Sequence, residues 1–169
     1  MAEQAESKQE ALAIFAGGCF WCLQPPFDKE PGVLETVVGY TGGTVKDPTY
    51  EQVSSGTTGH REAVAIHYDP AKLSYARLLD IFFDNIDPYD ASGQFVDKGS
   101  QYTTAIYVDN EAERAAAEAA IAGLEAKSGK KVATVIAPRV DFYPAEEYHQ
   151  DYYKKNPLRY QMYKKGSGR

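Results

Sequence analysis

The amino-acid sequence predicts an α/β or α+β sandwich, in which helices pack on a central sheet. Strand-like and helix-like segments alternate along its 169 residues, and two long polar connections interrupt them. A chain of this length can bury a sizeable hydrophobic core within one domain. No internal repeat or linker divides it, so we expect a single domain over residues 1–169. Its core would span about residues 12–155, between a polar N-terminal and a basic C-terminal tail.

The expected strands are short runs rich in β-branched and aromatic residues, or runs that alternate apolar and polar side chains. They cover residues 12–16, 33–40, 62–68, 103–108 and 132–136. The expected helices carry apolar residues at intervals of three and four, or follow a capping residue or a proline. They cover residues 73–86, 110–127 and 145–153. The second of these opens on Asn110, with Glu113 at the spacing of a capping box.

Composition and charge exclude several classes of function. The net charge of −6 argues against a surface for nucleic acid or for an anionic membrane. No stretch is apolar over the length of a membrane span, and the polar N-terminus is unlike a signal peptide. Two cysteines do not make a disulfide-stapled scaffold, which favours the reducing cytoplasm. We expect the lysine pairs at 154–155 and 164–165 to lie on a solvated terminus.

The most informative stretch is Gly17-Gly18-Cys19-Phe20-Trp21-Cys22, which follows the first expected strand. The two glycines allow a tight turn, and Cys19 then stands where a helix would begin. Because helix N-termini stabilise anions, we expect the pKa of the Cys19 thiol to be lowered, either at rest or when substrate binds. The alternative is that Cys19 is a small buried hydrophobic residue, as most free cysteines are.

Two cysteines three positions apart, in a reducing compartment, more often serve redox or metal chemistry than cross-linking. Zinc is a poor fit, since it needs four ligands and His60, His67 and His149 are scattered singly. We therefore expect no metal and no cofactor. Pro25 and Pro26 conflict with a continuous helix after the motif. Either that helix is kinked, or a new helix starts at the prolines.

Several ordered stretches resemble the signatures of the methionine sulfoxide reductase A family. They are Gly17-Gly18-Cys19-Phe20-Trp21, Gly39-Tyr40-Thr41-Gly42-Gly43, Pro48-Thr49-Tyr50-Glu51-Gln52-Val53, Thr58-Gly59-His60-Arg61-Glu62-Ala63-Val64, Asp97-Lys98-Gly99-Ser100-Gln101-Tyr102 and Tyr148-His149-Gln150-Asp151-Tyr152. The resemblance extends over roughly residues 12–160. Ordered motifs at matching spacing are far more specific than any single pattern.

The resemblance implies a mixed sheet with a ferredoxin-like βαβ core. It also implies reduction of the S epimer of methionine sulfoxide, free or in oxidised proteins, and hence protein repair under oxidative stress. Position by position, it makes Cys19 the nucleophile and places Glu62, Tyr50 and Tyr102 around the sulfoxide oxygen. Phe20 and Trp21 become the pocket for the substrate methyl group. The residues with supporting roles near that pocket are Asp97 and His149.

Elementary chemistry agrees with these roles. A sulfoxide oxygen is a poor leaving group until it is protonated, so attack of a thiolate at sulfur needs a nearby acid. A carboxyl kept protonated by apolar surroundings can supply the proton, and tyrosine hydroxyls can hold the oxygen. The products are methionine and a sulfenic acid on Cys19.

The sequence departs from the family pattern at its second cysteine. Many members have glycine at position 22 and resolving cysteines near the C-terminus, whereas this tail has Gln161 where such a cysteine is expected. Gln24 also replaces a common glutamate. Cys22 is then the only internal thiol that can condense with the sulfenic acid. The resulting disulfide would be reduced by a thioredoxin-like dithiol.

Two other functions stay open from the residues alone. A general thiol–disulfide oxidoreductase also carries a cysteine pair at a strand-to-helix turn, but it would not use Tyr50, Glu62 or Tyr102. A non-catalytic module could bind methionine-like side chains in an aromatic pocket. Such a module would keep its function in a Cys19→Ser variant, whereas an enzyme would lose it.

Overall fold

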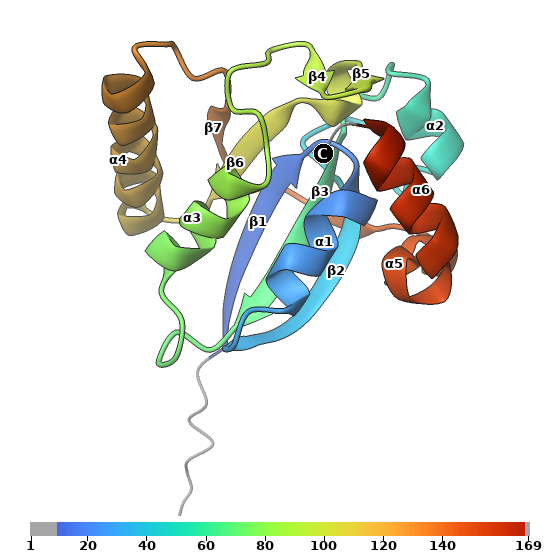
Figure 1. Cartoon of the computed structure of the whole chain (residues 1–169), viewed down its shortest axis with the longest axis horizontal. Coiled ribbons are helices and arrows are strands. Elements are labelled where there is room, and N and C mark those ends of the chain that lie inside the picture. The colour runs from blue at the N-terminus through green and yellow to red at the C-terminus, as the bar shows by residue number, and fades with distance from the viewer. Residues whose placement is uncertain (1–9, 168–169) are drawn as a thin grey trace, which may run out of the picture.

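The computed structural model of the chain describes residues 10–167 (Figure 1). Six strands form the central sheet: β1 (Ala11–Gly17), β2 (Val33–Thr41), β3 (Arg61–Tyr68), β6 (Thr104–Val108), β7 (Val135–Pro138) and β8 (Phe142–Pro144). Their order across the sheet is β7-β6-β1-β3-β2-β8. The pair β6–β7 is parallel and the other pairs of this sheet are antiparallel. A separate small hairpin joins β4 (Gly93–Gln94) to β5 (Asp97–Lys98).

Helices connect and cover these strands. They are α1 (Phe20–Asp28), α2 (Tyr50–Ser54), α3 (Tyr75–Asp84), α4 (Glu111–Ser128), α5 (Tyr152–Lys155) and α6 (Pro157–Ser167), with 3₁₀ turns η2 (Ser100–Tyr102) and η3 (Glu147–His149). Helix α1 links β1 to β2, which run parallel with β3 between them, and α4 links the parallel pair β6–β7. The predicted mixed α+β fold with a ferredoxin-like βαβ core is thereby confirmed. Among the described residues, no helix combines the length and apolarity needed to cross a membrane.

The larger hydrophobic core lies between the sheet and the helices α1, α3 and α4. Phe15 of β1 is fully buried there, with its ring centroid 4.9 Å from Phe82 of α3 and 5.9 Å from Phe27 of α1. A smaller cluster, which includes Ile14 and Tyr107, covers the opposite face of the sheet. Residues 14 and 15 therefore point to opposite faces of β1, as strand alternation requires. This packing fixes the position of α1 on the sheet.

Strand register brings distant residues together at one end of the central strands. Because β1 and β3 are antiparallel, the end of β1 lies beside the start of β3, and Ala16 pairs with Ala63. Gly17 pairs with Thr104 at the start of β6, while Glu62 pairs with Tyr40 near the end of β2. The turn from β1 into α1 therefore meets the first residues of β3 and the loop that precedes β6. The candidate site forms at this end of the strands.

Two glycines make the turn from β1 into α1 possible. Gly18 has φ +86°, a left-handed conformation that other residues rarely adopt. A Cβ on Gly17 would lie 2.8 Å from Ile86, which follows α3, and 3.0 Å from Leu23 of α1, so the close packing of both residues on the end of β1 needs a residue without a side chain. The sequence prediction of a tight turn with close approach is confirmed.

The structure resolves the conflict at Pro25 and Pro26, because one helix runs through both. Only the amides in the first turn of a helix lack an intrahelical acceptor. Pro25 and Pro26 are the sixth and seventh residues of α1, beyond that turn, so each proline removes one hydrogen bond from the helix. The helix continues past them, since the Lys29 amide donates to the Pro25 carbonyl at 3.2 Å. Burial of Phe27 just beyond the prolines offsets the lost bonds.

Two sequence predictions of secondary structure were wrong in detail. The last predicted strand, 132–136, is β7 at Val135–Pro138, because the amides of Val132 and Ala133 donate instead to Glu125 and Pro88. The predicted helix 145–153 is broken into η3 and α5. The break falls at Asp151, whose φ of +53° lies outside the right-handed helical region.

Candidate functional site

Cys19 is the N-cap residue of α1 and is 6% exposed. It hydrogen-bonds to the Cys22 thiol one turn further along, and no disulfide joins the two cysteines. Burial raises the pKa of Cys19 well above its ordinary value, and Cys22 and Glu62 add to this effect; the Trp21 amide opposes it. The predicted lowering of the resting pKa is therefore wrong, because loss of water outweighs the helix N-terminus. A lowering when substrate binds stays a prediction.

Glu62 is the second residue of β3 and is 1% exposed, although a glutamate at a strand start usually lies on the surface. One carboxylate oxygen accepts the backbone N–H of Phe20, in the first turn of α1, at 3.2 Å. Burial raises the pKa of Glu62 to about 8; Asp97 contributes in the same direction, while the Phe20 N–H lowers it. The carboxyl is therefore largely protonated at neutral pH, as proton donation to a bound oxygen requires.

Tyr50 and Tyr102 come from the two long connections and meet beside Cys19. Tyr50 opens α2 after a complete capping box, and Tyr102 ends η2 just before β6. The two hydroxyls hydrogen-bond to each other. Burial raises the pKa of both, and Glu62 and Cys19 add to this effect. Both tyrosines are therefore neutral hydrogen-bond donors in the physiological range.

Phe20 and Trp21 begin an aromatic wall beside Cys19. Phe20 is fully buried, with its ring 5.3 Å from that of His149. Trp21 is partly exposed and stacks on Tyr152 of α5 at 4.0 Å. The Trp21 indole N–H donates to His149 Nδ1 at 3.1 Å. Burial lowers the pKa of His149, which keeps its ring neutral and able to accept this bond.

Helix α6 brings Tyr163 to the site, a residue that the sequence reasoning missed. Its hydroxyl donates to the Asp97 carboxylate and hydrogen-bonds to Cys19, and its ring packs edge-on against Trp21 at 5.8 Å. Figure 1 shows the end of α6 beside the turn between β1 and α1. The lysine pairs at 154–155 and 164–165 are exposed, as expected, but Tyr160 and Tyr163 of the same segment pack against the protein. Tyr160 and Tyr163, three positions apart on one helical face, were the available signal.

Glu146 and Gln150 position the segment that carries His149, and sequence reasoning missed both. The Gln150 amide accepts from the Val38 N–H and donates to the Val38 carbonyl, each at 2.9 Å. It thereby continues the ladder of β2. The Glu146 carboxylate accepts the Tyr40 hydroxyl and the Tyr50 N–H, also at 2.9 Å each. These bonds connect η3 to β2 and α2.

The structure thus brings together every site residue that the sequence predicts. Within residues 10–167, no group of three or more His, Cys, Asp and Glu side chains is arranged to hold a metal ion. A neutral thiol, a protonated carboxyl and two half-buried tyrosine hydroxyls lie together beside an aromatic wall. This set can bind a polar oxygen, protonate it and attack the atom that carries it.

Known proteins share this sequence and fold. A sequence profile described as "Peptide methionine sulfoxide reductase" matches residues 11–169. "Peptide methionine sulfoxide reductase MsrA" of Halalkalibacterium halodurans is 54% identical over 165 residues, covering 96% of this chain and 93% of that protein. Reduced Mxr1 of Saccharomyces cerevisiae superimposes with a TM-score of 0.85 at 31% identity, over 92% of this chain and 90% of that one. Mxr1 in complex with Trx2 gives 0.59 at 22% identity, over 89% of each chain.

Proposed function

Because the chain belongs to the peptide methionine sulfoxide reductase A family and reduces methionine sulfoxide by thiol chemistry, we propose which residues carry each step. One observation carries the proposal: a Glu62 carboxyl with a pKa of about 8 lies beside the Cys19 thiol. Tyr50 and Tyr102 interact with both groups. Nucleophile, acid and oxygen-binding donors are the groups that the reaction needs.

In the first step, Cys19 attacks the sulfoxide sulfur. Glu62 donates its proton to the sulfoxide oxygen, which weakens the sulfur–oxygen bond, and the proton of the Cys19 thiol replaces the one that Glu62 gives up. The hydroxyls of Tyr50 and Tyr102 hold the oxygen while it is transferred. Oxygen passes from the substrate to Cys19, so the products are a methionine thioether and a sulfenic acid.

In the second step, Cys22 resolves the sulfenic acid. Its thiol already hydrogen-bonds to Cys19, and the Cys22 amide donates to the Cys19 carbonyl at 3.1 Å, so both cysteines belong to one turn of chain. Attack of the Cys22 sulfur forms a disulfide and releases the oxygen as water. No other cysteine exists in the sequence to take this role.

Phe20 and Trp21 are proposed to bind the methyl group of the substrate. Phe20 is fully buried, so the indole of Trp21 is the aromatic surface that a substrate can contact. His149 and Tyr152 hold that indole in place. Asp97 takes a supporting role through its bond to Tyr163. With oxygen directed to Glu62 and methyl to Trp21, one stereochemical arrangement at sulfur fits. We assign it to the S epimer, in free methionine sulfoxide and in oxidised proteins.

A thioredoxin-like dithiol is the proposed reductant of the Cys19–Cys22 disulfide. Mxr1, which has a related fold, has been crystallised in complex with Trx2. We propose that a protein similar to Trx2 is also the partner of this chain. Two electrons from the dithiol then restore both thiols. A reducing compartment, which we take to be the cytoplasm, suits two cysteines without a disulfide. The role is repair of oxidised methionine.

A single-turnover experiment tests these roles. The fully reduced protein is mixed with the S epimer of a methionine sulfoxide peptide, without reductant, and both the released methionine and the intact protein mass are measured. Wild type should release one methionine per chain and lose two hydrogens. Cys22→Ser should also release one methionine but gain one oxygen, and a dimedone adduct on Cys19 should identify the sulfenic acid.

Cys19→Ser is the matched control and should release no methionine. Methionine release by that variant would overturn the assignment of the nucleophile. A Cys22→Ser variant that turns over at the wild-type rate with thioredoxin would show instead that the sulfenic acid is reduced directly. Preference for the R epimer would overturn the assigned stereochemistry.

A further inference from the structure

The stacking partner of Trp21 lies next to a residue with a strained backbone. Tyr152 covers the Trp21 indole with ring centroids 4.0 Å apart and an interplanar angle of 10°. Asp151, immediately before it, has φ +53°, a conformation that persists only where neighbouring contacts hold it. The side chain of Gln24, in α1, supplies one such contact, because its oxygen accepts the Asp151 N–H at 3.1 Å. Gln24 is 1% exposed, so water does not compete for this bond.

A second bond holds the other neighbour of Tyr152. The Tyr153 hydroxyl donates to one oxygen of the Asp28 carboxylate at 2.5 Å. Burial and this carboxylate raise the pKa of Tyr153, so its hydroxyl keeps the proton that it donates. Asp28 lies about one turn after Gln24 on the same face of α1. The residues before and after Tyr152 are therefore both bonded to the helix that carries Trp21.

Thr36 of β2 joins the two side chains and fixes the order of their hydrogens. Its hydroxyl donates to the other oxygen of Asp28 at 2.5 Å and accepts from the Gln24 amide nitrogen at 3.0 Å. The orientation of that amide is set independently, since only its oxygen can accept from the Asp151 N–H. Position 24 thus needs both a donor and an acceptor, whereas an ionised glutamate there supplies acceptors only.

We propose that Gln24 and Asp28 are positioning residues of the substrate pocket. Through Tyr152 they hold the Trp21 indole where it contacts the methyl group of methionine sulfoxide. The indole is then fixed on its face as well as at its edge, where it donates to His149. The inference rests on the proposed role of Trp21. A displaced indole weakens binding of substrate and transition state alike, so the half-saturating concentration rises and the rate at saturation is kept.

Exchanging donor and acceptor groups tests this network. In Gln24→Glu, the single hydrogen of the Thr36 hydroxyl faces two carboxylates, so one of them loses its bond. Adding Asp28→Asn should restore the network, because the asparagine nitrogen can donate to Thr36 and the asparagine oxygen can accept from Tyr153.

Trp21 is the only tryptophan in the sequence, so its fluorescence reports the surroundings of the indole. In Gln24→Glu, acrylamide should quench this fluorescence several-fold more efficiently. Single turnovers with excess S epimer of a methionine sulfoxide peptide should give a half-saturating concentration about fivefold above wild type. The rate at saturation should stay within about twofold. The double variant Gln24→Glu/Asp28→Asn should return both readouts to near wild type.

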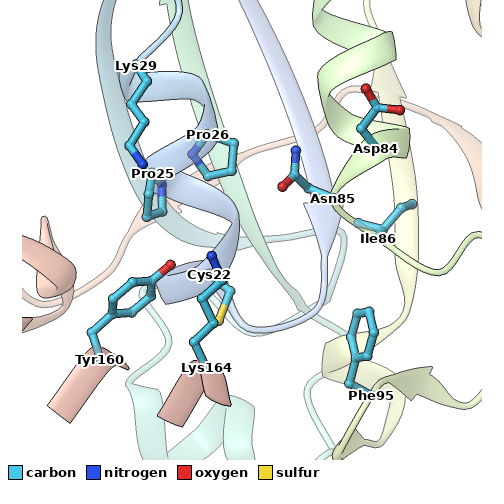
Figure 2. Close-up of a pocket in the computed structure, with 10 residues that line it drawn as sticks. All are labelled: Cys22, Pro25, Pro26, Lys29, Asp84, Asn85, Ile86, Phe95, Tyr160 and Lys164. Carbon is cyan, nitrogen blue, oxygen red and sulfur yellow. The ribbon is translucent and has the colours of Figure 1, made fainter. Parts of the chain in front are cut away.

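Lys29→Gln is the matched control, because it changes the net charge by the same amount as Gln24→Glu at the end of the same helix. Lys29 lies on another side of α1, where it lines a pocket of about 240 Å³ together with Cys22, Pro25 and Pro26 (Figure 2). Quenching and half-saturation in this variant should match wild type.

The inference is overturned if Gln24→Glu leaves either readout unchanged, or if Asp28→Asn does not reverse its effects. A loss of stability in urea without these changes would show a structural role only. Trp21→Ala separates such a failure from failure of the proposed function, since it should itself raise the half-saturating concentration. If it does not, the methyl group binds elsewhere, and the proposed role of Trp21 is overturned together with the inference.

Discussion

Replacing Glu62 with glutamine should change how the stability of the protein depends on pH. A glutamate has a pKa near 4.5 when exposed, and burial raises the pKa of Glu62 to about 8 in the folded protein. Between these values the unfolded chain has lost a proton that the folded chain keeps. Stability contributed by this group is therefore fully present below pH 4.5 and is lost as the pH rises toward 8.

The size of the effect follows from the same two values. Each pH unit across this interval costs about 1.4 kcal/mol of folding free energy, which amounts to roughly 5 kcal/mol between pH 4.5 and 8. Glutamine has nearly the same shape and no proton to lose. The free energy of unfolding of Glu62→Gln, minus that of wild type, should therefore rise with pH by about 1.4 kcal/mol per unit and level off above pH 8.

Urea unfolding at pH 5, 6, 7 and 8 measures this difference, and other titrating groups cancel in it. Glu35→Gln, which removes an exposed carboxyl from β2, is the matched control for the loss of one carboxyl from the sheet. A flat difference for Glu62→Gln would refute the reasoning, because Glu62 would then be ionised in the folded protein. In single-turnover assays, Glu62→Gln should also slow methionine release by about 10²–10⁴-fold.

Three further variants test the surroundings of the site. Tyr163→Ala removes the ring and hydroxyl that cover Cys19, so alkylation of Cys19 by iodoacetamide should become several-fold faster; an unchanged rate would mean that α6 does not shield the thiol. Gln150→Ala removes the acceptor of the Val38 N–H, while the Val38 carbonyl keeps the Ala145 N–H; it should cost about 1–3 kcal/mol in urea unfolding, and no loss would contradict this anchor. Gly17→Ala brings a Cβ to 2.8 Å from the nearest side-chain atom. It should cost about 1–3 kcal/mol, and wild-type stability would show that α1 shifts freely.

Local chemistry along the chain was enough to predict much of this protein. The strand followed by two glycines and a cysteine defines the turn at Cys19, because each of these preferences acts over a few residues. The same holds for α4, where the Asn110 side chain accepts the Glu113 amide and Gly129 ends the helix with φ +73°. Ordered motifs then identified the family, since their spacing is carried by the sequence itself.

Tertiary structure decided the ionisation of the site and the fate of the C-terminal segment. Helix-start chemistry predicts a lowered pKa for Cys19, yet β3 and α6, far along the chain, exclude the water that would stabilise the thiolate. Segment 157–167 has weak apolar periodicity. Its position over Cys19 depends on the hydrogen bond of Tyr163 to Asp97 and on its ring contact with Trp21. Desolvation and such long-range contacts are sums over neighbours that only the folded chain assembles. Apart from the spacing of Tyr160 and Tyr163, no local pattern in the sequence records them.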